Sequence, residues 1–503
     1  MRIYTPDAVR NAEKYMIDVL GTSSLGLMKK AAAGMHTAIC DNLVDISTIC
    51  VLCGKGNNAG DGYELARLLH NNGYNVSCVK VFGDAPCTDI AKICHDEYVD
   101  CGGAYTDDVD KALREIVSAD VIIDAVFGIG FNGHIENDSF IYRVFDVANN
   151  VCAKRIALDV PSGVNSCDGS IGGIAFKADI TLTVNVIKSG MLSYPAKKYC
   201  GSIQTVNIGI PESVIEKFEN NYCFVPDNEY VKSALPERAV DSNKGDFGKV
   251  LCICGSEDMT GAAVMSVGAA LRSGAGIVTL ASVECVSDIV KCRYPEPIYK
   301  KLEFDDASCT AAFLNDIKNY SAVLVGCGLG KSENKRLFIE NIIRSYKGTL
   351  IIDADGINLI SHNINILKEA ECTVILTPHP AEFSRISGIN VPFVNENRIK
   401  CAKDFSKAYR CITVLKGAGT VITDGDKTAV NTSGNPGLAK GGSGDVLAGL
   451  IAGLAANKSV SPFDAATCGV FLHGKAADVL KAKYSEYGLL PSDLAEEFAK
   501  MLP

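Results

Sequence analysis

Short apolar runs alternate with amphipathic helical patterns along most of the chain, and many of the runs end in a glycine-rich turn. In the first half they predict strands at 47–53, 75–82, 120–127, 155–160, 180–187 and 203–208. In the second half they predict a helix at 260–273 and strands near 249–255, 276–281, 321–326, 349–353, 373–377, 411–415 and 420–423. This alternation is typical of an α/β fold, a parallel sheet covered by helices on both faces. Ligands of such sheets bind beyond the carboxyl ends of the strands, which is where the turns lie.

The alternation stops between about 211 and 247, a stretch with three prolines, many charges and no convincing strand. A chain of 503 residues is too long for one ordinary core. We therefore predict two consecutive α/β domains, at 1–215 and 225–503, with a junction near residue 220.

Charge and hydropathy narrow the class of partner. The net charge is −10, from 49 basic and 59 acidic residues, and the basic residues are scattered. The protein therefore lacks the positive electrostatic potential that would attract nucleic acid or an anionic membrane. Apolar runs such as 446–456 are shorter than the roughly 18 residues of a membrane span. The N-terminus predicts a helix capped by Thr5 with Pro6 at its first position, and not an apolar signal segment. We expect a cytoplasmic protein, a homo-oligomer, with small molecules as partners.

The 21 cysteines do not indicate disulfides or zinc. Many lie inside apolar strand-like runs, and Cys50 and Cys53 form a C-x-x-C whose members would point to opposite faces of a strand. No second C-x-x-C at zinc spacing follows, and the seven histidines form no H-x-x-x-H. Free thiols used as small apolar side chains are the better interpretation.

The turn "CGKGNNAGDG" (53–62) is the first candidate site. It lacks the G-K-[ST] of a phosphate-binding Walker loop and does not match G-x-G-x-x-G. Its glycines still expose backbone N–H groups at a helix start, which suits a phosphate. Asn57, Asn58 and Asp61 add side-chain groups that a plain phosphate cradle does not require. The alternative is a tight strand-to-helix turn with Asp61 as the helix cap.

Two more strand ends support a site. "DAVFGIGFNGH" (124–134) begins with Asp124 and continues into a G-x-G-x-x-G, and "LDVPSGVNS" (158–166) places Asp159 and Ser162 after another strand. Oxygen atoms of Asn58, Asp124 and Ser162 could gather as hard ligands for a cation such as potassium. For each of them the alternative is a turn cap.

The stretches "LMKKAAAG" (27–34), "GKGNNAGDG", "DAVFGIGFNG" and "DVPSG", in this order, resemble the NAD(P)H-hydrate epimerase domain over about residues 1–212. The departures are small: Ala59 stands where glycine is usual, and Ile129 where threonine is usual. The resemblance implies a Rossmann-like three-layer sandwich with potassium at Asn58, Asp124 and Ser162. It also implies that the hydrate binds to Asn57, Asn58, Ala59, Gly60, Asp61, Gly128, Ile129, Gly130, Phe131, Asn132, Gly133, His134 and Asp159.

The most informative stretch of the chain is "GNPGLAKGGSGDVLAGLIAGLAA" (434–456). The turn 441–444 leads into a helix whose first turn carries Asp445. Backbone amides there can hold a phosphoryl group, and the carboxylate can accept a hydroxyl proton, which together equip a site for phosphoryl transfer to an alcohol. The alternative is an aspartate that only complements the helix dipole. Upstream, Lys416 and Thr420 could seat a nucleotide, and His379 stands between two prolines on a loop.

The second half resembles the ribokinase-like superfamily, and within it the ADP/ATP-dependent NAD(P)H-hydrate dehydratases. "SNKGDFGKVLCICGSEDMTGAA", "GCGLG", "TPHPAE", "KGAGT" and "NPGLAKGGSGDVLAG" occur in the family's order between about 236 and 503. Ser443 stands where bacterial members often have methionine. The resemblance implies a ribokinase-like three-layer sandwich, Mg²⁺ bound with ADP, and two sets of binding residues. The nucleotide would bind to Lys416, Gly417, Ala418, Gly419, Thr420 and Gly444, and the hydrate to Ala262, Ala263, Gly328, His379 and Asp445.

These resemblances predict a bifunctional enzyme, an isomerase and a lyase, that repairs hydrated NADH and NADPH. The first domain would interconvert the R and S hydrates with Asp159 as acid/base. The second would use ADP to phosphorylate the C6 hydroxyl of the S form and then eliminate phosphate, with Asp445 as base. Lys188 could assist Asp159 or be a solvated lysine. Dehydration followed by rehydration and ring opening both remain open as epimerisation paths, as does ADP against ATP.

Parts of the sequence also allow three other functions. The chain could be a small-molecule kinase with a regulatory N-terminal domain, or a dinucleotide sensor that only binds. A plain NAD-dependent dehydrogenase is disfavoured, because no acidic residue follows "GIGFNG" at the expected distance on a second strand.

Overall fold

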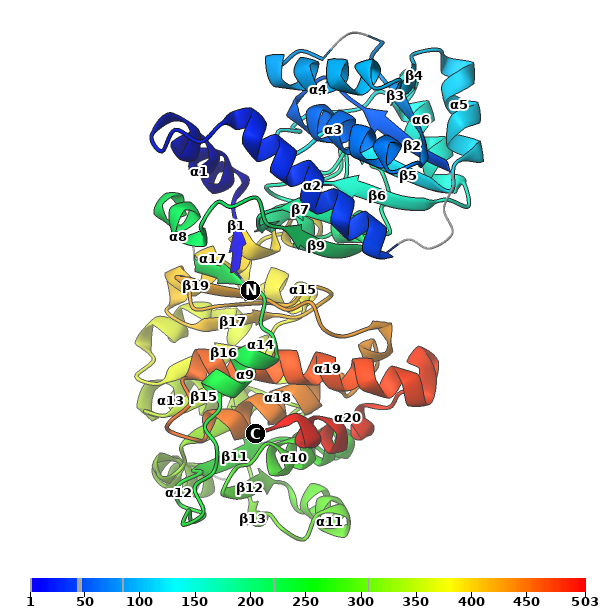
Figure 1. Cartoon of the computed structure of the whole chain (residues 1–503). Helices are drawn as coiled ribbons and strands as arrows, with labels where there is room; N and C mark the ends of the chain where they lie inside the picture. Colours follow the sequence, from blue (N-terminus) through cyan, green and yellow to red (C-terminus); the bar gives the residue numbers. More distant parts are fainter. Residues whose placement is uncertain (1, 43–47, 84–85, 220–221, 306) are drawn as a thin grey trace. The chain divides into compact units, whose positions relative to one another are not determined.

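The computed structural model (Figure 1) describes the chain except residues 1, 43–47, 84–85, 220–221 and 306. Two compact units divide it, Arg2–Tyr222 and Cys223–Pro503. The predicted junction near residue 220 and the predicted first residue of the 47–53 strand lie outside the described residues.

A seven-stranded parallel sheet forms the centre of the N-terminal unit. Its order is β4-β3-β2-β5-β6-β7-β9, and the predicted strands are found within a few residues of their expected bounds. β4 was not predicted, because three residues at a sheet edge are too short to show a period of two. The strands are β2 (Thr48–Cys53), β3 (Asn75–Lys80), β4 (Ala104–Thr106), β5 (Val121–Ala125), β6 (Lys154–Leu158), β7 (Ile180–Val184) and β9 (Ser202–Val206).

Helices pack on both faces of this sheet, which gives the predicted three layers. One core is shared by the sheet with α1 (Pro6–Asp18), α2 (Ser24–Asn42), α3 (Asn57–Asn71) and α4 (Asp89–Asp100). The other is shared with α5 (Val109–Ser118) and α6 (Phe140–Asn150). Cys53 belongs to the first core and Cys50 to the second, as the C-x-x-C spacing predicted. The cysteines of the described chain are free thiols.

The start of the chain confirms the predicted helix cap. Thr5 accepts a hydrogen bond from the Ala8 N–H at 3.3 Å, and Pro6 is the first residue of α1. Before it, β1 (Arg2–Tyr4) pairs in parallel with β8 (Ile187–Lys188). Short helical segments complete the unit: η1 (Ser189–Leu192), α7 (Lys197–Cys200), α8 (Glu212–Ile215) and η2 (Glu216–Phe218).

The C-terminal unit is built on the strand order β13-β12-β11-β14-β15-β16-β17-β18-β19. Pairing is parallel from β13 to β17 and antiparallel from β17 to β19. These strands are β11 (Lys249–Ile253), β12 (Ile277–Ser282), β13 (Ile298–Lys301), β14 (Ala322–Val325), β15 (Thr349–Ile352), β16 (Thr373–Leu376), β17 (Ile412–Leu415), β18 (Val421–Thr423) and β19 (Lys427–Val430). A short strand, β10 (Tyr222–Phe224), lies in the stretch where no strand was expected.

Helix α18 (Ser443–Ala455) is the central helix of this unit and is buried along most of its length. It packs closely on α10 (Thr260–Arg272): a Cβ on Gly449 would lie 2.1 Å from the Ser266 carbonyl oxygen, so only glycine fits there. The remaining helices are α9 (Asn228–Ala234), α11 (Glu284–Arg293), α12 (Ala307–Asp316), η3 (Ile317–Asn319), α13 (Glu333–Ser345), α14 (Asp355–Ile360), η4 (Ser361–Glu369), α15 (Pro380–Ser387), α16 (Val391–Glu396), α17 (Arg398–Tyr409), η5 (Pro436–Leu438), α19 (Pro462–Gly488), α20 (Pro491–Phe498) and η6 (Ala499–Met501). Within the described chain, no helix has the length and apolar character that a membrane span needs.

Each sheet has one point where the strand order reverses. In the N-terminal unit the chain leaves β2 toward β3 on one side, and β5 lies on the other. In the C-terminal unit β11 stands in the same way between β12 and β14. Ligands of open α/β sheets bind at such points, beyond the carboxyl ends of the strands.

Candidate active sites

A cavity of about 680 Å³ opens at the reversal point of the N-terminal sheet, a volume suited to a small molecule or cofactor. Many residues predicted to bind the hydrate line it: Asn57, Asn58, Asp61, Gly128, Ile129, Gly130, Phe131, Asn132, Gly133 and Asp159. Three others do not. Ala59 is buried, a Cβ on Gly60 would lie 2.6 Å from Met28 Sδ, and His134 is exposed. The alternative of Asp61 as a helix cap is wrong, because α3 begins at Asn57 with Gly56 as its cap.

Three stretches far apart in the sequence meet in this cavity. A Cβ on Gly128 would lie 3.2 Å from Asp159 Oδ2 and 3.5 Å from Asn58 Cβ. The turn after β2, the turn after β5 and the residue after β6 therefore converge on one point.

Asn58, Asp124 and Ser162 form one buried group beside the cavity. Ser162 donates to Asp124 through its hydroxyl (2.6 Å, to Oδ1) and its N–H (2.7 Å, to Oδ2). Asn58 Nδ2 donates to the Phe127 carbonyl at 2.9 Å. Burial raises the pKa of Asp124 to about 6, although the hydrogen bonds from Ser162 and Val126 oppose the rise. Asn58 Oδ1 is buried and has no hydrogen-bond partner among the described residues, so one oxygen acceptor of the group remains unsatisfied there.

Asp159 has an unusual backbone conformation, and its carboxylate binds a buried lysine. Its φ is +65°, which is uncommon for a residue other than glycine. Lys188 is fully buried and donates to Asp159 Oδ1 at 2.5 Å, to the Thr183 hydroxyl at 2.9 Å and to the Val184 carbonyl at 2.8 Å. The ammonium thus uses its three donors, and the alternative of a solvated lysine is wrong.

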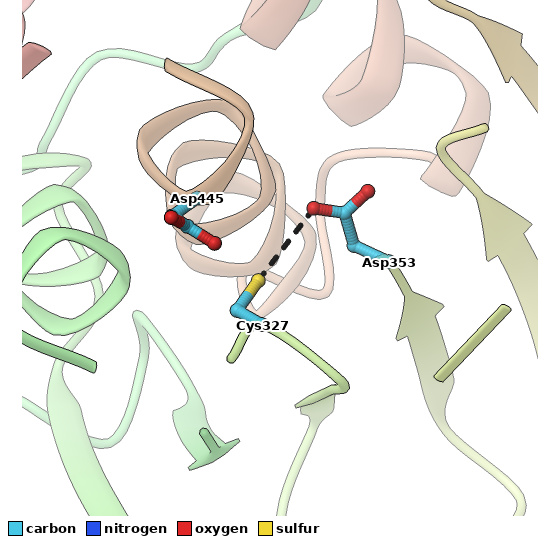
Figure 2. Close-up of side chains that lie close together, drawn as sticks. All are labelled: Cys327, Asp353 and Asp445. Atoms are coloured by element: carbon cyan, nitrogen blue, oxygen red, sulfur yellow. Dashed lines mark hydrogen bonds between the residues drawn. The ribbon is translucent and has the colours of Figure 1, made fainter. Parts of the chain in front are cut away.

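The C-terminal unit brings two carboxylates and a thiol together at its own reversal point. Figure 2 shows Asp445 on α18, Asp353 directly after β15 and Cys327 after β14. One potential ligand atom from each lies within 4.8 Å of those of the other two. Cys327 Sγ donates to Asp353 Oδ2 at 3.6 Å.

The pKa of Asp445 is raised mainly by burial. Burial and the neighbouring charge of Asp353 raise its pKa to about 6, while Cys327 and Lys416 oppose the rise. Asp353 is 1% exposed, and its Oδ1 accepts from Lys416 Nζ at 2.7 Å and from the Thr377 hydroxyl at 2.6 Å. A carboxyl with such a pKa can take up a proton near neutral pH.

The glycine turns bring further predicted residues to the same place. A Cβ on Gly444 would lie 3.4 Å from Lys416 Nζ, so the start of α18 meets the 416–420 turn. That turn is closed by Thr420, whose hydroxyl donates to the Gly417 carbonyl at 2.8 Å.

The residues predicted to bind the hydrate in this unit differ in exposure. Gly328 has a φ of +59°, and its Cβ would lie 2.6 Å from Ala262 Cβ, whereas Ala263 is buried in the core. His379 caps α15, where its Nδ1 accepts from the Ala381 N–H at 3.2 Å. Burial and the charges of Lys416 and Arg385 lower the pKa of His379, which favours the neutral imidazole.

Comparison with known proteins places both units in one family. The family model described as NAD(P)H-hydrate dehydratase matches residues 250–500, and that of the YjeF-related protein N-terminus matches 24–190. A bifunctional NAD(P)H-hydrate repair enzyme Nnr of Thermofilum pendens is 34% identical over 98% of this chain and 93% of its own length. That of Escherichia coli K12 is 32% identical over 98% and 92%. The chain belongs to the bifunctional NAD(P)H-hydrate repair enzyme family.

A solved structure supports the fold of the C-terminal unit. A ribokinase-like superfamily protein of Enterococcus faecalis V583 is 27% identical and superposes with a TM-score of 0.50, over 56% of this chain and 95% of its own. The predicted ribokinase-like fold of this NAD(P)H-hydrate repair family member is confirmed.

Sequence reasoning missed several residues of the two sites. Asp353 lies in "IIDADG", directly after a predicted strand, which was a usable signal. Cys327 lies in the "GCGLG" turn, which gave no sign of its contact with Asp353, and Glu13 lies in the predicted N-terminal helix without any signal of its own. His473, buried in α19, donates from Nε2 to the Ser443 carbonyl at 3.0 Å and so fixes the start of α18. Its burial lowers its pKa to about 4, and it gave no signal in the sequence.

Proposed function

We propose that the chain repairs hydrated NADH and NADPH by two activities. The N-terminal domain, 1–215, interconverts the R and S hydrates, and the C-terminal domain, 225–503, dehydrates the S form with ADP. The observation that carries the proposal is Asp445, a carboxyl with a pKa of about 6 in the first turn of α18 beside a glycine turn. The homo-oligomeric state and the cytoplasmic location stay predictions.

The dehydratase step solves a leaving-group problem, because hydroxide leaves carbon poorly near neutral pH. Asp445 takes the proton of the C6 hydroxyl as that oxygen attacks the terminal phosphorus of ADP and AMP departs. The ring nitrogen then expels phosphate from C6, and loss of a C5 proton restores the dihydropyridine. The backbone amides of the 441–444 turn stabilise the charge on the transferred phosphoryl group.

The predicted binding residues would hold the two substrates of this step. Lys416, Gly417, Ala418, Gly419, Thr420 and Gly444 would hold the nucleotide, and Ala262, Ala263, Gly328 and His379 the hydrate. The donors fit Mg²⁺, because Asp353 and Asp445 offer hard carboxylate oxygens within 4.8 Å of each other. Mg²⁺ bound with ADP would neutralise phosphate charge.

The fall of dehydratase kcat/KM at acidic pH should follow the protonation of Asp445. The base must be ionised to accept a proton, and its pKa is raised to about 6. We expect log(kcat/KM) for the S hydrate to be flat above pH 6 and to fall about tenfold per pH unit below it, since kcat/KM reports groups of the free enzyme. Initial rates between pH 4.5 and 8 with saturating ADP measure this. A break at pH 4 would contradict a buried base.

In the N-terminal domain, we propose that Asn57, Asn58, Asp61, the 128–134 turn and Asp159 bind the hydrate, with Asp159 moving protons. Ala59, Gly60 and His134 belong to the same predicted set. The donor set Asn58, Asp124 and Ser162 fits potassium, because Asn58 Oδ1 is a buried oxygen that no described residue contacts through a hydrogen bond.

Removing that oxygen should weaken potassium binding. Asn58→Ala is expected to raise the KCl concentration for half-maximal epimerase activity by about tenfold or more, the usual cost of disturbing a metal site. Titrating KCl against constant ionic strength measures it. The control is Asn71→Ala, at the exposed end of the same helix. Equal KCl dependence in both variants would remove the potassium proposal.

One incubation tests the whole function. A mixture of R and S hydrates of NADH is incubated with ADP, with ATP or without nucleotide, and absorbance of NADH and inorganic phosphate are followed. Full conversion with nucleotide requires both domains, and conversion that stops at the S fraction shows an inactive first domain. A stable phosphorylated product would instead support a small-molecule kinase. Binding without turnover would support a sensor.

A further inference from the structure

Helix α1 contributes a carboxylate to the N-terminal cavity. Arg10, Glu13 and Ile17 follow one another at spacings of three and four residues, so they lie on one helix face, and all three line the cavity. The same cavity is lined by Asp61 from α3 and by Asp159 from the end of β6. Three carboxylates from three separate elements therefore face one space.

The carboxylates of Glu13 and Asp159 differ in whether they have an ion-pair partner. Asp159 has the Lys188 ammonium at 2.5 Å, whereas no hydrogen bond or ion pair reaches the Glu13 carboxylate from the described residues. Burial and the charge of Asp159 raise the pKa of Glu13 to about 7, with Lys188 and Arg10 opposing the rise. Glu13 can thus give and take a proton near pH 7, beside a carboxylate that carries its own counter-ion.

Other charged groups lie in the cavity and on the elements packed against α1. Lys55 lines the cavity after β2, and the pKa of Asp61 is raised by burial and by the charges of Asp159 and Glu13. On α8 and η2, which pack against α1, Glu212 accepts from the Tyr4 hydroxyl, Glu216 pairs with Arg2, and Lys217 lies over the Tyr15 ring.

Inverting C6 needs proton transfer on both faces of the ring. By the dehydration and rehydration path, the hydroxyl leaves C6 from one face as water, and a second water adds from the other. One group must protonate the leaving oxygen and another must deprotonate the incoming water. Because the reaction runs between R and S in both directions, the two groups exchange roles when it reverses.

We infer that Glu13 is a catalytic residue of the epimerase site and forms a two-group proton-transfer pair with Asp159. The inference rests on the proposed epimerase function. In one direction the protonated group gives its proton to the C6 hydroxyl, the C6–O bond breaks as the ring nitrogen forms an iminium with C6, and water leaves. Water then bonds to C6 on the opposite face, its proton passes to the other carboxylate, and the nitrogen recovers its electron pair. One water leaves and one enters, one proton is given and one taken, and nothing is oxidised.

An isotope label distinguishes the two epimerisation paths that the sequence leaves open. The pair exchanges solvent oxygen into C6 at each turnover, because the departing and arriving waters are different molecules. Incubating the R hydrate in H₂¹⁸O without nucleotide should therefore place one ¹⁸O in each S molecule as it first forms. Ring opening and reclosure retains the original oxygen unless the opened aldehyde hydrates.

The test is Glu13→Gln in the full chain, with R-to-S conversion followed by chromatography in the absence of nucleotide and corrected for the uncatalysed rate. We expect kcat to fall by about 10²–10⁴, the usual contribution of a general acid or base, with KM changed little. In the wild type, kcat plotted against pH should change slope (a limb) near pH 7, and the Glu13→Gln variant should lack this limb. Glu13→Asp should keep the limb and part of the rate, because it retains a carboxylate.

Controls distinguish the possible failures. Asp18→Asn removes an exposed carboxylate from the same helix and should leave epimerisation unchanged. If the Glu13→Gln protein still dehydrates the S hydrate with ADP, its C-terminal domain is intact. An unchanged KM for the R hydrate shows that its first domain is folded.

Wild-type protein that does not convert the R hydrate would end the proposed function itself. Active wild type with a Glu13→Gln variant of equal kcat and an unchanged limb near pH 7 would overturn only the role of Glu13. If Glu13→Gln does not fold, Glu13→Asp is the test. A Glu13→Asp variant whose kcat profile has no limb near pH 7 would overturn the role of Glu13.

Discussion

Asp445→Asn is expected to lower kcat for dehydration of the S hydrate by about 10²–10⁴, the range of a general base. Asparagine has nearly the same size and still lies at the start of α18, but it cannot take the proton of the C6 hydroxyl. Phosphate release from the S hydrate with ADP measures the loss. Nucleotide binding should persist, because the glycine turns and Lys416 are untouched.

The matched control separates a base from a charge that only serves a helix dipole. Glu284 is exposed and lies in the first turn of α11, as Asp445 lies in the first turn of α18. Glu284→Gln should keep full activity and cost at most about 1 kcal/mol of stability. If Asp445→Asn behaves in the same way, Asp445 is a dipole partner and the phosphorylation step has no base. Epimerisation of the R hydrate should be equal in both variants.

The strands and the glycine turns could be predicted because their signals are local. An apolar run of five or six residues followed by glycines is visible in any window, and the turns 53–62, 124–134 and 441–444 all lie at the ends of real strands or at a helix start. Fold class and site location follow from this pattern, since parallel strands place their carboxyl ends at one edge. The short strands β4 and β10 have three residues each and give no such signal.

The partners of the predicted acids could not be predicted, because burial and proximity across the fold are not local properties. Glu13 is one of several charged residues in an ordinary helix until α1 lies over the cavity. From the sequence, Lys188 could equally be a solvated lysine. In the structure it lies on β8 inside the unit, where its ammonium has three acceptors. Asp353 follows a strand like many aspartates, and only the fold brings it to Lys416 and Asp445.

Lys416→Met should destabilise the C-terminal unit strongly and move the pH profile of the dehydratase. The substitution keeps most of the side-chain volume but leaves Asp353, which is 1% exposed, without its ion-pair partner. Breaking a buried pair from one side costs about 3–5 kcal/mol, because an uncompensated charge stays behind. Since Lys416 also opposes the rise in the pKa of Asp445, the acidic limb of kcat/KM should move above pH 6. Urea unfolding and the pH profile of phosphate release measure the two effects.

The exposed pair Lys400–Asp404 provides the control, because its side chains are 71% and 62% exposed and solvent screens the interaction. Lys400→Met should leave both the stability and the pH profile almost unchanged. Adding Asp353→Leu to Lys416→Met removes the stranded charge as well, so it should recover much of the lost stability while activity stays low. A double variant as unstable as Lys416→Met alone would mean that packing around the lysine stem, and not the buried charge of Asp353, causes the loss.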